Sequence, residues 1–184
     1  LNRIYRVRHD YRRADLRLDA AELLGQDEVS QADIERVRAQ YERDWQEWPW
    51  EAGAPFYDWD GDGVYDPQVD EPSFRAVDCS QVPSQCASRA DQVAFFIIND
   101  LDEGATAAFH GSPPIGMEVQ VTLWAYALTG PMGDALFKKF TIIYKGTAAA
   151  ADDARIDDLY FAQWSDTDIG VFSNDFAGAD TTLN

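Results

Sequence analysis

Apolar positions recur every three or four residues between residues 31 and 48, and this period predicts an amphipathic helix. The stripe consists of Ile34, Val37, Tyr41, Trp45 and Trp48. Ser30 stands at the expected N-cap with Asp33 three residues later, and Pro49 ends the helix. Such a stripe is typical of core packing. Upstream, residues 1–18 alternate enough to predict an extended arm or edge strand, and residues 19–24 predict a short helix ended by Gly25.

After Asp91 the hydrophobic period changes from that of a helix to that of strands. The continuous apolar run 93–98 predicts a central strand covered on both faces. Residues 116–128 alternate strictly, and 137–145 and 156–164 predict two more strands. We therefore expect a mainly β, α+β fold: an antiparallel β-sandwich with an N-terminal helical segment on one face or edge.

The length of 184 residues favours a single globular unit, which we expect to be a piece of a longer protein. The chain divides into three regions that differ in their predicted structure. Residues 1–50 predict the arm and the helix packing on the sandwich, 51–90 a loop region, and 91–184 the sandwich core.

The loop region contains a dense run of acids between residues 58 and 70. Carboxylates on alternate residues, with a glycine-permitted bend, supply the hard oxygen ligands that Ca²⁺ prefers. The predicted ligands are Asp58, Asp60, Asp62, the backbone carbonyl of Val64, Asp66 and, as a further candidate, Asp70. The alternative is an acidic solvated turn, because Asp and Gly are common turn residues.

This loop resembles the calcium loops of EF-hands, dockerins and thrombospondin type 3 repeats over about a dozen residues. It departs from the EF-hand pattern where the bidentate Glu would stand, because Val69 occupies that position. Pro67 also prevents a helix from leaving the loop directly. The resemblance therefore implies a rigid structural calcium loop, and not a helix-opening sensor.

Charge and cysteines bear on location and partners. The net charge is −18, with nine arginines against eleven acids in residues 1–50 and six basic residues against twenty-two acids afterwards. Such a surface argues against nucleic acid and anionic lipid as partners. The longest apolar run is far below the ~20 residues that span a bilayer. A Cys79–Cys86 disulfide is favoured over free thiols and fits an extracellular or cell-surface location.

Two further groups of residues are candidates for binding. Asp166, Asp168 and Asp175 predict a second metal site, with an ordinary polar loop as the alternative. Trp124 and Tyr126 lie on the more polar face of their predicted strand and could stack on sugar rings. The favoured alternative is that the N-terminal helix buries them.

No catalytic constellation stands out. The only histidines are His9 and His110, and neither lies in a nucleophile motif. A carboxylate pair of glycosidase type would be found by chance among so many acids. The sequence therefore favours a non-enzymatic protein.

Several stretches together resemble a family of large secreted proteins of Bacteroidetes-type bacteria that type IX secretion carries to the surface. They are 45–49 (WQEWP), 53–63 (GAPFYDWDGDG), 90–93 (ADQV), 111–120 (GSPPIGMEVQ), 137–140 (FKKF), 164–170 (WSDTDIG) and 180–183 (DTTL). The resemblance implies an extracellular or cell-surface setting, a β-rich module and a longer parent chain. It supplies no shared activity and no catalytic residues.

These observations predict a non-enzymatic, calcium-stabilised β-sandwich module of a secreted or cell-surface multidomain bacterial protein, with a structural or adhesive role. Its expected partners are calcium and an extracellular polysaccharide or another surface protein. One alternative is a carbohydrate-binding module that uses Trp124 and Tyr126. The other is a glycoside hydrolase based on carboxylates.

Overall fold

The structure is a computed structural model that describes residues 3–72, 90–147 and 154–163. The chain divides into two compact units, 1–151 and 152–184, and each is described by itself. In the described parts of the chain, no helix has both the length and the apolar character needed to cross a bilayer. The cysteines and the acids after residue 163 lie outside the described residues, so the disulfide and the second metal site stay predictions.

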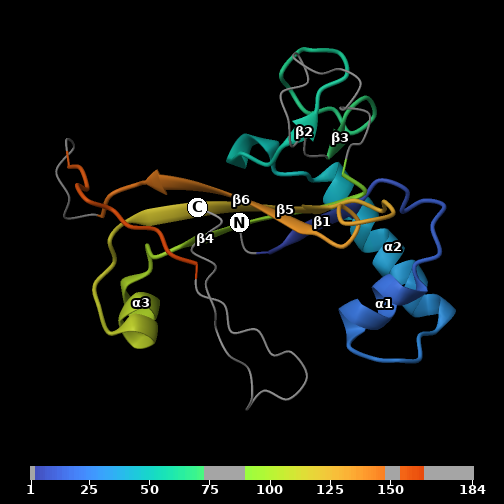
Figure 1. The fold of residues 1–184 in the computed structure, drawn as a ribbon, viewed down its shortest axis with the longest axis horizontal. Helices are drawn as coiled ribbons and strands as arrows, with labels where there is room; N and C mark the ends of the chain where they lie inside the picture. Colours follow the sequence, from blue (N-terminus) through green and yellow to red (C-terminus); the bar gives the residue numbers. More distant parts are fainter. Residues whose placement is uncertain (1–2, 73–89, 148–153, 164–184) are drawn as a thin grey trace. The chain divides into compact units, whose positions relative to one another are not determined.

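The first unit is an α+β fold built on a four-stranded antiparallel sheet in the order β1-β4-β5-β6 (Figure 1). The strands are β1 (Tyr5–Arg8), β4 (Gln92–Asn99), β5 (Met117–Ala125) and β6 (Leu136–Tyr144). A two-stranded ribbon pairs β2 (Phe56–Tyr57) with β3 (Glu71–Pro72). The helices are α1 (Arg17–Leu24), α2 (Gln31–Gln46), the 3-10 helix η1 (Trp50–Ala52) and α3 (Glu103–His110).

The sequence predicted the antiparallel sheet and the N-terminal helices correctly. Gly25 ends α1 at φ 62°, and Ser30 and Asp33 form the capping box of α2. The strand predicted for 156–164 is wrong over its described residues 156–163, which form no strand. Asp158 has φ 57° there, and this left-handed backbone interrupts any strand. The described residues contain no second large sheet, so a sandwich is not shown.

The main core lies between α2 and one face of β1 and β4. Val7, Val93 and Phe95 point to this face and are buried, as are the stripe residues of α2. Trp48 packs edge-on against Tyr5, at a centroid distance of 6.4 Å. Burial alternates along β4, and Ile98 near its end is 54% exposed. Among the described residues the core therefore lies on one face of this strand, and cover on its other face stays a prediction.

The outer edge of β1 is closed by α2. His9 donates its backbone N–H to Asp91, so the alternation of an antiparallel ladder turns the N–H of Arg6 away from β4. That N–H is accepted by Oδ2 of Asp44, at 3.1 Å, on α2. Asp44 is 1% exposed, and its other oxygen accepts from Gln40 at 2.9 Å. The helix thus supplies an acceptor for the outward N–H of Arg6 and shields this edge from pairing with another strand.

One carboxylate joins β4 to β5 across the segment that holds α3. Asp100 follows β4 and accepts backbone N–H groups from Ile115, Gly116 and Met117 at 2.5–3.2 Å. Partial desolvation acts to raise the pKa of Asp100, but these donors outweigh it and hold the pKa below its ordinary value. This clamp fixes the start of β5 next to the end of β4.

Candidate metal centre

The acidic loop is held at both ends by the β2–β3 ribbon. Phe56 pairs with Pro72, and Tyr57 pairs with Glu71, so residues 58–70 form the closed connection between the two strands. A short ribbon of this kind brings the first and last acids of the loop close together. Strands of two residues are too short to show an alternating hydrophobic pattern. The sequence therefore did not predict that the β2–β3 ribbon closes the loop.

Aromatic residues of α2 and its C-terminal end hold the loop to the core. The indole N–H of Trp45 donates to the carbonyl of Pro67 at 3.0 Å, and the hydroxyl of Tyr65 donates to the carbonyl of Trp45 at 2.7 Å. Trp48 donates to the carbonyl of Pro55 at 2.9 Å. Burial raises the pKa of Tyr65, so its hydroxyl stays protonated and remains a donor. Trp45 and Trp48 of the apolar stripe therefore hold the loop by hydrogen bonds and also pack in the core.

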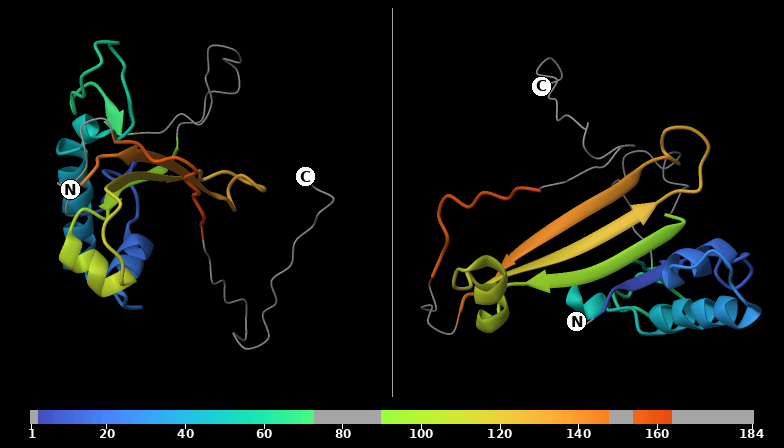
Figure 2. Two further views of the ribbon diagram at one scale, coloured as in Figure 1. Left: turned by 90° about the vertical axis from the view of Figure 1, so that its left-hand side faces the viewer. Right: turned by 90° about the horizontal axis from the view of Figure 1, so that it is seen from below.

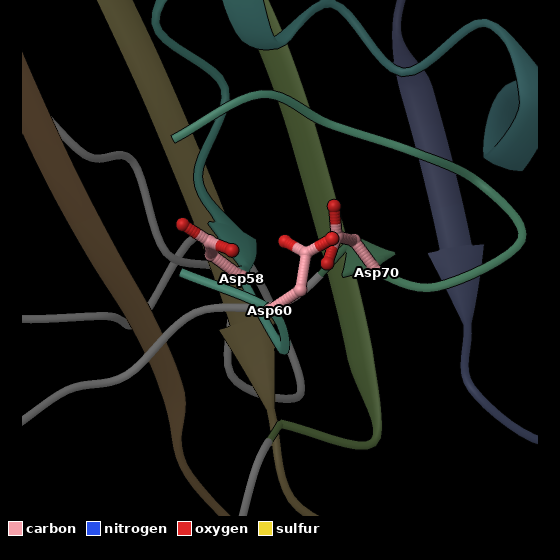
Figure 3. Close-up of side chains that lie close together, drawn as sticks. All are labelled: Asp58, Asp60 and Asp70. Atoms are coloured by element: carbon pink, nitrogen blue, oxygen red, sulfur yellow. The ribbon is translucent and has the colours of Figure 1, made fainter. Parts of the chain in front are cut away.

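Three carboxylates of the loop converge. Asp58, Asp60 and Asp70 each offer an oxygen, and these oxygens lie within 4.8 Å of one another (Figure 3). The three side chains differ in burial: Asp70 is 1% exposed, Asp58 is half-buried and Asp60 is exposed. No other group of three or more metal-ligating side chains occurs in the part of the chain that the structure describes.

Two of the three carboxylates also organise the loop backbone. Asp58 accepts N–H groups from Gly61 at 2.6 Å and from Gly63 at 2.9 Å. Both glycines have φ 77°, a left-handed backbone that other residues rarely adopt. Asp70 accepts from Trp59 at 2.9 Å with one oxygen and from Asp66 with the other. The loop is therefore wound around Asp58 and Asp70.

The electrostatics of the cluster differ between its members. The N–H groups of Gly63 and Gly61 lower the pKa of Asp58 below its ordinary value. Partial desolvation raises the pKa of Asp60, and the negative charges of Asp62 and Asp70 act in the same direction. The protein alone therefore disfavours the ionised form of Asp60 and favours that of Asp58. A bound cation would relieve this repulsion.

The donor set fits a hard divalent cation such as Ca²⁺. Two oxygens bound to one Ca²⁺ at about 2.4 Å can lie up to about 4.8 Å apart, which matches the spacing of the three carboxylates. Calcium takes six to eight oxygens, so backbone carbonyls or water would complete the shell. The carboxylates of Asp58 and Asp70 retain lone pairs for a cation, because each of their oxygens accepts one backbone hydrogen bond and has two lone pairs.

The remaining predicted ligands are placed differently. Asp62 accepts the N–H of Val64 at 2.7 Å, and Asp66 accepts the N–H of Gln68 at 2.8 Å. These are Asx turns, in which the side chain bonds to the backbone two residues on. Neither carboxylate belongs to the converging group. Their role as ligands, like that of the Val64 carbonyl, stays a prediction.

The candidate sugar-binding aromatics are buried. Trp124 is 7% exposed and Tyr126 6% exposed. Phe137 stacks on Trp124 at a centroid distance of 5.5 Å, and together with Ala90 these residues form a small cluster separate from the main core. Their rings are therefore not presented to solvent. This cluster is distinct from the one that holds the helix, which was expected to bury them.

Comparisons with family models, with curated proteins and with solved structures find no match to this chain. The resemblance to secreted bacterial proteins therefore stays a prediction.

Proposed function

We propose that this protein is a non-enzymatic module whose acidic loop binds Ca²⁺ and is stabilised by it, within a secreted or cell-surface bacterial protein. The observation that carries the proposal is the convergence of Asp58, Asp60 and Asp70 within 4.8 Å. Calcium would bind the folded loop and not the unfolded chain, so it would stabilise the fold by mass action. At a hundredfold excess over the dissociation constant, this linkage contributes about 2.7 kcal/mol.

Asp60 is the residue through which to test the site. It is exposed, and among the described residues its backbone donor is the N–H of Asp62, at a long 3.4 Å. Asp60→Asn therefore removes a ligand charge while leaving the backbone hydrogen bonds of Asp58 and Asp70 in place. Asp15→Asn is a matched control, because Asp15 has a 70% exposed side chain outside the loop.

The experiment is thermal unfolding with Ca²⁺ and with EDTA. We expect a calcium-dependent rise in melting temperature of roughly 5–10 °C in the wild type and in Asp15→Asn, and none in Asp60→Asn. Terbium luminescence, excited through Trp59 beside the cluster, provides an independent measure of occupancy. Equal melting temperatures with calcium and EDTA in the wild type, without a terbium signal, would refute calcium binding. The loop would then be an acidic turn.

The predicted β-sandwich stays part of this proposal. What supports it is the apolar second face of β5, where Met117, Val119 and Leu123 are half-buried and opposite to the helix side. A second sheet packed at about 10 Å would cover such a face. An NMR assignment of all strands tests this point: two packed sheets would support the sandwich, and one sheet alone would refute it.

A further inference from the structure

A cleft lies along the edge of the sheet that β1 forms, where α2 packs against both β1 and α1. Figure 2 shows both helices next to β1, at the opposite edge of the sheet from β6. The cleft has a volume of about 400 Å³, which falls at the lower end of the range of small-molecule sites. Its lining comes from all three elements and from the segment before β1.

The wall of the cleft is mostly apolar. Val37 and Tyr41 of α2 form its buried part. Leu23 of α1 and Ile4 form its outer part, and they are 44% and 61% exposed. Removing such apolar surface from water is favourable. The wall therefore favours a ligand with an apolar body.

Three charged side chains also line the cleft, and two of them neutralise each other. Arg3 lies 3.3 Å from the carboxylate of Asp44, whose side chain is 2% exposed, and 2.6 Å from Glu47. Gln40 and the backbone N–H of Arg6 also donate to Asp44. Arg3 and Asp44 are therefore both engaged. The third charge, the guanidinium of Arg6, leaves the cleft with a positive charge.

The guanidinium of Arg6 has no carboxylate partner among the described residues. Its carbon lies 5.6 Å from the centre of the Tyr41 ring, and no described residue forms an ion pair or a side-chain hydrogen bond with it. Arg8, two positions along the strand, differs in holding Asp19 at 2.8 Å. A guanidinium has five N–H donors and can bind a carboxylate through two parallel hydrogen bonds. The contact with the Tyr41 ring holds Arg6 at the cleft without using these donors.

From these observations we infer that the cleft binds a small apolar carboxylate. Its carboxylate accepts hydrogen bonds from the guanidinium of Arg6, and its apolar body lies against Leu23 and Val37. A cationic ligand is disfavoured, because both oxygens of Asp44 already have donors and Arg6 would repel it. The net charge of the chain opposes an anion only weakly here, since residues 1–50 hold nine arginines against eleven acids. This inference does not depend on the metal loop.

The probe is hexanoate, and hexan-1-ol, which has the same chain without the charge, is the control ligand. Each is titrated into the ¹⁵N-labelled protein in EDTA, so that the acidic loop carries no metal. We expect saturable shifts at the amides of Arg6, Val37 and Tyr41 with hexanoate. Binding of hexan-1-ol is expected to be at least about tenfold weaker, because it cannot accept two charge-assisted hydrogen bonds.

Replacing Arg6 tests the recognition of the carboxylate. Arg6→Gln removes the guanidinium but keeps the backbone N–H that Asp44 accepts. It is expected to weaken hexanoate binding at least about tenfold and to leave the binding of hexan-1-ol unchanged. Arg6→Lys keeps the charge without the paired donors and should fall between Arg6→Gln and the wild type. Arg17→Gln is the matched control, because the side chain of Arg17 is 71% exposed outside the cleft.

A second pair of variants tests the apolar wall. Leu23→Ala shortens a side chain that lines the cleft and is expected to weaken the binding of hexanoate and hexan-1-ol alike, by about fivefold. Leu18→Ala is its control, because Leu18 lies on the same helix, is 78% exposed and does not line the cleft. The melting temperatures of all variants verify that the fold is kept, and the exposed position of Leu23 keeps the test open if an Arg6 variant unfolds.

Several results would overturn the inference. Shifts remote from the cleft, equal binding of hexan-1-ol and hexanoate, or equal hexanoate binding by Arg6→Gln and the wild type each contradict recognition of a carboxylate by Arg6. Equal binding by Leu23→Ala and Leu18→Ala contradicts the apolar wall. Absence of saturable hexanoate binding up to tens of millimolar would mean that the cleft holds only water. None of these results bears on calcium, because EDTA is present throughout.

Discussion

Replacing Asp70 tests whether the acidic loop is held by its own hydrogen bonds before any metal binds. Its carboxylate is buried and accepts the N–H of Trp59 with one oxygen and that of Asp66 with the other, at 2.9 and 2.8 Å. Asp70→Ala removes both acceptors. The loop is then closed only by the two residue pairs of the β2–β3 ribbon and by the aromatic anchors.

The magnitude follows from those two bonds. A hydrogen bond to a charged group contributes about 1.5–3 kcal/mol, and the lower end applies because Trp59 and Asp66 are exposed and water can replace the lost acceptor. We therefore expect Asp70→Ala to lower the free energy of unfolding by about 2–3 kcal/mol. That corresponds to a fall in melting temperature of roughly 5–10 °C. Asp70→Asn keeps one acceptor and is expected to lose about half as much.

The assay is thermal unfolding in EDTA, followed by circular dichroism, on the wild type, Asp70→Ala and Asp60→Asn. Asp60→Asn serves as the matched loop variant, because the backbone hydrogen bond that Asp60 accepts is long and the variant is expected to melt near the wild type without metal. If Asp70→Ala melted with the wild type in EDTA, its carboxylate would not organise the loop. The reasoning from hydrogen bonds to loop closure would then be wrong.

Three further substitutions test other parts of the fold by denaturant unfolding. Tyr41→Phe removes the 2.6 Å hydrogen bond to the buried Asp19 and is expected to lower the free energy of unfolding by about 1 kcal/mol; an unchanged value would show that water replaces the hydroxyl. Gly116→Ala places a Cβ 2.5 Å from the backbone of Gly146 at φ 90°, and is expected to cost at least about 2 kcal/mol; a neutral result would contradict the close approach. Asp100→Ala is expected to cost about 2–3 kcal/mol at neutral pH. Because the folded pKa of Asp100 is lowered, its contribution is complete above the ordinary value of about 4 and is lost as the pH falls through the folded value. The difference between wild type and Asp100→Ala should therefore shrink in acid, and a constant difference would refute the charge-assisted clamp.

The elements with strong local signals were predictable from the sequence. The structure reproduces the predicted cap and period of helix α2, and the helix ends at Gln46, before Pro49. Strand β5 alternates without interruption, and its bounds fall within the predicted range. Local periodicity does not say what covers a face, however. The alternating apolar residues of β5 share one face, yet the main core lies on the opposite face of the sheet, with Phe95 and Trp48.

The candidate site was predictable in composition and only partly in geometry. Acid and glycine spacing identified Asp58 and Asp60, and Asp70 was a further candidate at the end of the same loop. The structure makes Asp70 the buried member of the group, because the β2–β3 ribbon brings the end of the loop back to its start. Pairing of residues that lie far apart along a loop leaves no periodic signal. The sequence therefore favoured ligands at alternate positions along the loop over a group formed by its two ends.

Several acidic residues in this chain act as hydrogen-bond acceptors for the backbone, and this changes what an acidic cluster means. Asp44 closes a strand edge, Asp100 clamps two strands, and Asp58 and Asp70 wind a loop, each through backbone N–H groups. The proximity of Asp58 to Asp70 would be explained without any cation. The backbone hydrogen bond that Asp60 accepts, from Asp62, is long at 3.4 Å, so the loop backbone depends less on Asp60 than on Asp58 and Asp70. A bound cation would favour the ionised form of Asp60, which its surroundings disfavour. The convergence of the three carboxylates carries the metal hypothesis, and Asp60→Asn tests it with the least disturbance of the loop backbone, so this substitution decides between a calcium loop and an acidic turn.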